Sequence, residues 1–139
     1  MTSENFEKNL SELKNNSITL SGQSIDEDFF SIVIKFSQGT ILRVDYWRII
    51  KNGSHLISSF DHKQQYGLPT PINAIEQAKE ELEGKSVSEV KFEKETGDLI
   101  FKFTDDLKLQ VLNFTGYEVW EINFPDGSGE FSNYAREYE

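Results

Sequence analysis

The stretch ILRVDYWRIIKNGSHLISSF, residues 41–60, decides the fold class. Residues 41–51 are rich in β-branched and aromatic types, a composition typical of strands. Asn52-Gly53 is the strongest short hairpin signal in the chain, because both positions of a tight hairpin turn favour positive φ. We therefore expect one long strand over 41–51, a turn, and an antiparallel partner strand over 54–60.

Similar apolar segments lie on both sides of this hairpin and are separated by short turns. They predict further strands over 17–20, 29–36, 87–93, 98–104, 108–114 and 118–124. Consecutive strands joined by short loops pair in antiparallel fashion. The chain therefore favours a mainly antiparallel sheet of about eight strands.

Two segments have helical periodicity instead. Phe6, Leu10 and Leu13 recur at the spacing of one helix face and predict a helix over 3–15. A second helix is expected over 71–83, with Thr70 as its cap and Pro71 at its first position. The expected fold is α+β in a single domain, 1–139. Its polar tail, 125–139, is expected to be loosely held or a short helix.

The two halves of the chain share an order of elements, a helix followed by about four strands. Residues 31–47 align with 98–114 at an offset of 67, and the identical pairs are Lys35/Lys102, Phe36/Phe103, Leu42/Leu109 and Val44/Val111. Upstream, Ser17 aligns with Ser86 at an offset of 69. This favours an internal αββββ duplication over 3–60 and 70–124, with a pseudo-two-fold axis or one continuous sheet. Apolar periodicity alone would also produce much of the agreement.

Composition narrows the class of partner. Twenty-four acidic residues face fourteen basic ones, a net charge of −10. Such a charge opposes binding to nucleic acid or anionic membranes and favours a basic protein, although it also serves solubility alone. There are no cysteines, which excludes disulfides and thiolate chemistry and suits a reducing cytoplasm, the expected location. We find no apolar run long enough for a membrane helix and no signal-peptide pattern.

Motifs for catalysis are absent. The sequence has no Gly-x-Ser-x-Gly, no His-Glu-x-x-His, no calcium loop, no P-loop and no dinucleotide fingerprint, so no metal or cofactor is expected. The two histidines fall on or near the 55–70 loop region. They give an alternative small-ligand or hydrolase site made of His55, Asp61, His62, Gln65 and Tyr66. The competing interpretation is a polar loop whose side chains hydrogen-bond locally.

Several short pieces carry a resemblance. They are SSFDHKQQYGLP at 58–69, TGDL at 96–99, LQV at 109–111 and GYEVWEI at 116–122. Together they are similar to small bacterial proteins found beside polymorphic toxins, some of which are immunity proteins. The resemblance implies a protein that is not an enzyme and that neutralises a toxin domain by occluding its active surface. It implies no catalytic residues.

The C-terminal part of the chain is the expected contact face, because acids dominate 115–139. The candidate partner-binding residues are Tyr117, Glu118, Glu121, Asp126 and Glu130. Acidic groups complement a basic toxin, and Tyr117 supplies an aromatic anchor. Trp120 is expected in the core.

Overall fold

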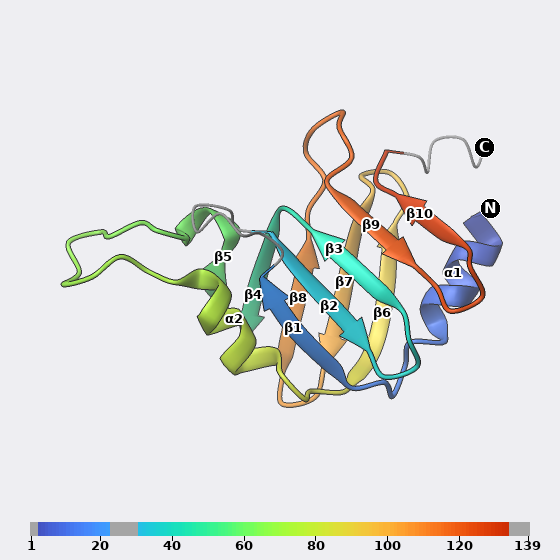
Figure 1. The fold of residues 1–139 in the computed structure, drawn as a ribbon, viewed down its shortest axis with the longest axis horizontal. Coiled ribbons are helices and arrows are strands. Elements are labelled where there is room, and N and C mark those ends of the chain that lie inside the picture. The colour runs from blue at the N-terminus through green and yellow to red at the C-terminus, as the bar shows by residue number, and fades with distance from the viewer. Residues whose placement is uncertain (1–2, 23–30, 134–139) are drawn as a thin grey trace.

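The computed structural model describes residues 3–22 and 31–133. This part of the chain contains two α-helices, a short 3-10 helix and ten strands. The strands form two antiparallel five-stranded sheets, which confirms the predicted α+β class. Two separate sheets replace the single sheet of about eight strands (Figure 1).

Each sheet combines strands from both halves of the chain. Sheet one has the order β1 (Ile18–Gly22), β2 (Ile32–Phe36), β3 (Ile41–Val44), β9 (Trp120–Asn123) and β10 (Gly129–Phe131). Sheet two has the order β5 (Ser54–Ser58), β4 (Trp47–Lys51), β8 (Leu107–Val111), β7 (Asp98–Phe103) and β6 (Val87–Glu93). The predicted hairpin is β4 and β5, and its turn residues Asn52 and Gly53 both have positive φ.

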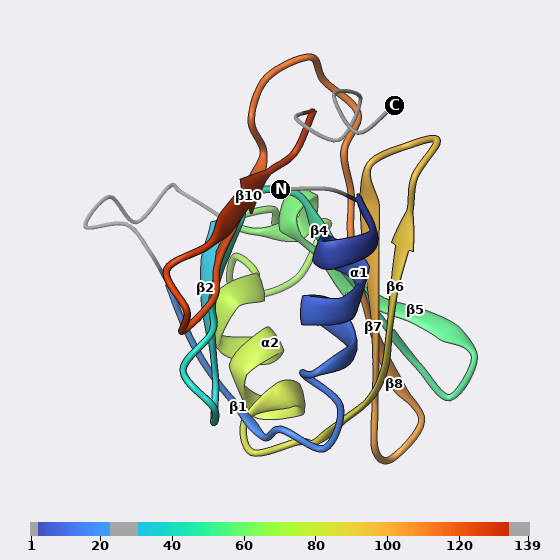
Figure 2. The ribbon, with the colours of Figure 1, turned by 90° about the vertical axis from the view of Figure 1, so that its right-hand side faces the viewer.

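The two helices lie between the sheets. Figure 2 shows the sheets facing each other, with α1 (Ser3–Ser11) and α2 (Ala74–Leu82) in the space between them. α1 contacts β6 at one end of this space, and α2 contacts β1 and β5 at the other. Phe6 and Leu10 of α1 and Leu82 of α2 are buried there. The helices therefore close both ends of a single apolar core.

The segment 41–51, predicted as one strand, is divided between the sheets. β3 ends at Val44 in sheet one, and β4 begins at Trp47 in sheet two. The crossing is held by backbone bonds, because Asp45 N donates to Val119 O at 2.9 Å and Leu112 N donates to Tyr46 O at 2.9 Å. The prediction of a continuous strand was wrong because both sheets bury part of this segment.

Other boundaries also differ from the prediction: α1 ends at Ser11 rather than at residue 15. α2 begins at Ala74 with Asn73 as its N-cap, whose side chain accepts a hydrogen bond from Glu76 N at 3.1 Å. Helix was predicted from Pro71, but Ile72 N bonds to Gln64 O at 2.8 Å, so residue 72 belongs to the preceding loop. The predicted polar tail contains a strand, β10, which pairs with β9. Residues 134–139 lie outside the described part of the chain.

The strand orders of the two sheets correspond. If β1 to β5 are exchanged with β6 to β10, the order of sheet one becomes the order of sheet two. Each half of the chain contributes three strands to one sheet and its last two strands to the other. A half contains five strands rather than the predicted four.

The halves meet at an isolated antiparallel bridge between Ser17 and Ser86. These are the residues that the sequence aligned at an offset of 69. The hydrogen bonds flanking the bridge come in matched pairs: Asn15 N to Val87 O and Gly84 N to Ile18 O, both 2.8 Å. An internal duplication predicts this two-fold relation; common descent of the halves stays a prediction.

Candidate functional site

Three aromatic rings pack against one another at the surface, and we call them the aromatic surface cluster. It consists of Tyr46, Phe60 and Phe114. The Tyr46 ring lies 5.5 Å from the Phe60 ring and 5.3 Å from the Phe114 ring, and Phe60 lies 6.1 Å from Phe114, all between centroids. Phe60 and Phe114 are each 56% exposed, while Tyr46 packs partly against the core.

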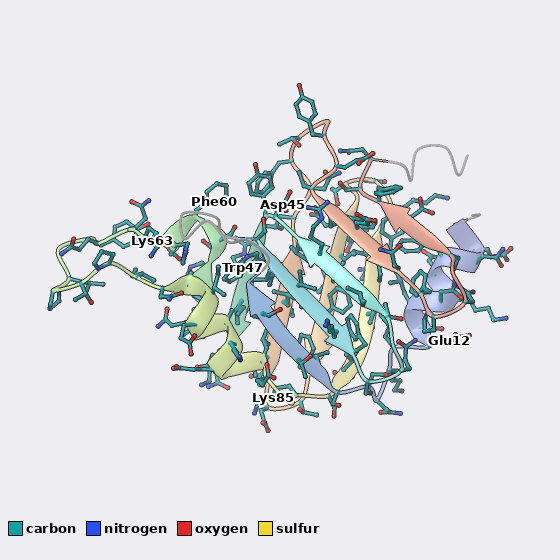
Figure 3. All side chains as sticks on the ribbon, in the orientation of Figure 1. Glu12, Asp45, Trp47, Phe60, Lys63 and Lys85 are labelled. Atoms are coloured by element: carbon teal, nitrogen blue, oxygen red, sulfur yellow. The ribbon has the colours of Figure 1, made fainter. Side chains whose placement is uncertain are left out.

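The cluster forms where three connections converge. Tyr46 lies in the crossing from β3 to β4, Phe60 in the 3-10 helix η1 (Ser59–Asp61) that follows β5, and Phe114 in the connection from β8 to β9. Trp47 follows Tyr46 directly but is fully buried, whereas Phe60 lies on the outside of the fold (Figure 3). Tyr46 lies in the bend immediately before β4 and is half-buried.

A braced loop adjoins the cluster. Residues 112–119 carry Phe114 and, at their tip, Tyr117, which is 83% exposed. Tyr117 N donates to Thr115 Oγ1 at 3.1 Å, and Asn133 Nδ2 donates to the carbonyl groups of Thr115 and Tyr117. Exposed aromatic rings on a held backbone are typical of protein-binding surfaces, because little conformational entropy is lost when they are covered.

The predicted acidic surface is only partly formed. Glu118 is exposed in the same loop as Tyr117. Glu121 lies on the outer face of sheet one, where its carboxylate is 4.0 Å from Arg43 Nε, so its charge is partly compensated. Asp126 is exposed in the turn between β9 and β10, and hydrogen bonds from the Ser128 hydroxyl and backbone N–H lower the pKa of its carboxyl group.

Glu130 was predicted on this surface and is instead buried. Its side chain is 1% exposed, because β10 places it opposite the buried Ile122 of β9. Among the described residues, neither carboxylate oxygen of Glu130 has a hydrogen-bond partner. The strand β10 is only three residues long and lies in a polar stretch, so the sequence pattern did not predict it. Glu130 is therefore not part of the candidate contact surface.

Part of the alternative ligand site comes together around Asp61. Its carboxylate accepts hydrogen bonds from Ser58 N at 2.9 Å and from Tyr66 OH at 3.0 Å, and His55 Nε2 lies 3.7 Å away. The hydrogen bond from Tyr66 to this carboxylate raises the pKa of the phenol. Asp61 therefore ties the start of the 62–73 loop to β5.

The other two residues of that site point elsewhere. His62 is buried, and its Nδ1 accepts a hydrogen bond from Ala74 N at 3.1 Å at the start of α2. Gln65 Nε2 donates to Leu68 O within the loop. The Ser58 hydroxyl donates to Asp61 at 3.3 Å. The two histidines of the predicted site are therefore separated: His55 lies beside Asp61, whereas His62 bonds to the start of α2.

The described residues form neither a metal centre nor a helix that spans a membrane. In residues 3–22 and 31–133, no three His, Asp or Glu side chains lie close enough together to hold a metal ion. Within the same ranges, each helix is too short or too polar to cross a bilayer.

Known proteins give no independent guide to the site. Comparisons of the chain with protein-family models, with curated proteins and with solved structures found no match. The candidate site is therefore the one that exposure and geometry single out, the aromatic surface cluster with the adjoining Tyr117 and Glu118.

Proposed function

We propose that this chain is a protein-binding domain that covers a partner with the aromatic surface cluster, and that the partner is a basic toxin domain neutralised by occlusion. One observation carries the proposal: Phe60 and Phe114 stack together yet remain more than half exposed. Burying apolar surface contributes about 25 cal/mol per Å², so a partner that covers these rings gains affinity.

The charge of the chain supports a basic partner. A net charge of −10 attracts a basic surface over several ångströms and accelerates encounter. Glu118 and Tyr117 place a carboxylate and an aromatic ring in the same loop as Phe114. Apolar anchors with a charged rim are the usual arrangement of a specific protein interface.

The test is affinity capture from the native host at low salt, with the tagged chain and a double variant, Phe60→Ser/Phe114→Ser. Ile41→Ser is the matched control, because Ile41 is also an exposed apolar residue, 41% exposed on β3. We expect one basic protein to be retained by the native chain and by the control but not by the double variant. When produced together with the chain, that protein should lose its toxicity.

Two results would contradict the proposal. The first is capture of the same partner by the double variant with unchanged affinity. The second is a captured protein whose toxicity persists in a stoichiometric complex, since occlusion requires the bound toxin to be inactive.

A further inference from the structure

A pocket lies on sheet two, at the end where two hairpins turn. Its volume is about 370 Å³. It is lined by Ile50, Gly53, Ser88, Lys102, Phe103, Asp106, Leu107 and Lys108. Figure 2 shows the β4–β5 hairpin projecting from sheet two on the side away from the helices. The volume is at the lower end of the range for small-molecule sites, roughly 300–1,000 Å³.

The pocket is flanked by two β-bulges. One lies between Ile49 and Ile50, where β4 pairs with β5. The other lies between Val87 and Glu89, where β6 pairs with β7, and leaves Ser88 unpaired. The Ser88 hydroxyl donates to Lys102 O at 3.1 Å. Bulges redirect side chains and bend strands, and they are frequent beside functional sites.

Two lysines are placed directly opposite each other in this pocket. Lys102 of β7 pairs with Lys108 of β8, and like charges in this position destabilise a sheet. Lys102 Nζ lies 3.2 Å from Glu89 Oε2, which compensates one charge. Among the described residues, no carboxylate lies within ion-pair distance of Lys108. Lys108 therefore brings an ammonium group without an ion-pair partner among the described residues into a pocket that Asp106 also lines.

We propose that this pocket binds a small molecule carrying one oxyanion group, a phosphate or a carboxylate, held between Lys102 and Lys108. Each ammonium group has three donors, so Lys102 contacts the anion without releasing Glu89. Ile50 lies opposite Lys108 in the pairing of β4 with β8 and offers an apolar wall beside the charged pair. The pocket lies at the end of β4 and the start of β8, whereas Tyr46 and Phe114 lie at the other ends of these strands. The inference does not depend on the proposed function.

Asp106 limits the class of ligand. It lies in the turn between β7 and β8 and lines the same pocket. A second anionic group on the ligand would meet this carboxylate, so a ligand with a single anionic group is favoured. A hydroxyl or amino group on the ligand would be a suitable donor to Asp106.

The experiment is an amide-resolved NMR titration of the whole chain with inorganic phosphate, butyl phosphate, acetate and butyrate in separate arms. We expect saturable shifts concentrated at Gly53, Ser88, Lys102 and Lys108, with the butyl compounds binding more tightly than their parent ions. The phosphate and carboxylate arms show which oxyanion is preferred. Absence of saturable binding in all arms would overturn the proposal.

Substitutions distinguish binding of the anion in this pocket from non-specific attraction of anions to surface lysines. Lys108→Met and Lys102→Met should each weaken binding by about tenfold, the usual value of one charge-assisted hydrogen bond. Asp106→Asn should strengthen it. Lys91→Met is the matched control, because Lys91 is on the same sheet and pairs with Glu93 at 3.0 Å. If Lys91→Met weakens binding as much as Lys108→Met, the pocket is not the site. A dispersed spectrum shows that each variant is folded.

Discussion

Trp47 and Trp120 are held in the same way in the two halves of the fold. Each is fully buried at the start of its strand, and each backbone N–H donates to the hydroxyl of a buried serine twelve residues later. Trp47 N is 3.1 Å from Ser59 Oγ, and Trp120 N is 3.3 Å from Ser132 Oγ. The two serines thus satisfy backbone groups at the points where the chain enters β4 and β9.

Replacing either serine should destabilise the protein. Ser59→Ala and Ser132→Ala each remove a hydroxyl that accepts a hydrogen bond from a buried N–H, which costs about 1–3 kcal/mol of the free energy of unfolding. Ser132 also accepts from Val119 N at 2.6 Å, so its replacement should cost more. Urea denaturation measures both. Ser21→Ala, at an exposed position of β1, is the control and should change little. Equal stability of all three variants would contradict the structural role.

Local patterns predicted most elements of this fold, because helix periodicity and turn chemistry depend on neighbouring residues. The crossing between β3 and β4 was missed, since no glycine or proline interrupts 41–51. The spacing of two apolar residues already conflicted with a strand that has one polar face. Val44 and Trp47 are three positions apart, so in a continuous strand they would face opposite sides, and in the structure both are fully buried. Only tertiary structure decides between one strand buried on both faces and two strands in separate sheets.

The aromatic surface cluster could not be predicted from the sequence for a related reason. Tyr46, Phe60 and Phe114 come from three separate connections, and only the packing of the two sheets brings them together. Composition predicted an acidic contact face, but it could not show that Glu130 is buried or that Glu121 faces Arg43. Of that predicted surface, Tyr117 and Glu118 lie in the same loop as the exposed ring of Phe114.

Glu130 should be a liability for stability. A buried carboxylate without hydrogen-bond partners loses its hydration and gains nothing in return. Glu130→Leu removes this cost and should raise the free energy of unfolding by about 1–4 kcal/mol. Thermal and urea denaturation measure the change, and Glu118→Leu at an exposed position is the matched control. A fall in stability would mean that the carboxylate has a structural role that its surroundings in the described chain do not reveal.

The ion pair of Lys85 with Asp105 should make the free energy of unfolding depend on pH in the acidic range. Lys85 Nζ lies 2.5 Å from Asp105 Oδ2, and this hydrogen bond lowers the pKa of Asp105. Lys85 lies at the lower edge of the molecule in Figure 3. A lowered pKa stabilises the fold above the ordinary aspartate value of about 3.9, and the contribution is lost as the pH falls through the lowered value. Asp105→Asn should therefore reduce stability at pH 7 and lose its effect in acid.

Asp106→Asn is the matched control for that measurement. Both residues have positive φ in the same turn, which asparagine also tolerates, and Asp106 makes no ion pair among the described residues. Urea denaturation of both variants between pH 2 and 7 compares them, a range set by the aspartate pKa of about 3.9. A destabilisation of Asp105→Asn that is independent of pH would show that the turn conformation, not the charge, is responsible.

Charge reversal at Glu118 and at Asp126 should affect association with the partner to different extents. Glu118 lies in the loop that carries Phe114, whereas Asp126 lies in the turn at the other end of β9. If the aromatic surface cluster is the contact, Glu118→Lys should slow association with the captured basic partner and flatten its dependence on salt, because nearby charges steer encounter. Asp126→Lys changes the net charge equally and should have a smaller effect. Stopped-flow association rates at several salt concentrations measure both, and equal rates for the two variants would place the contact elsewhere.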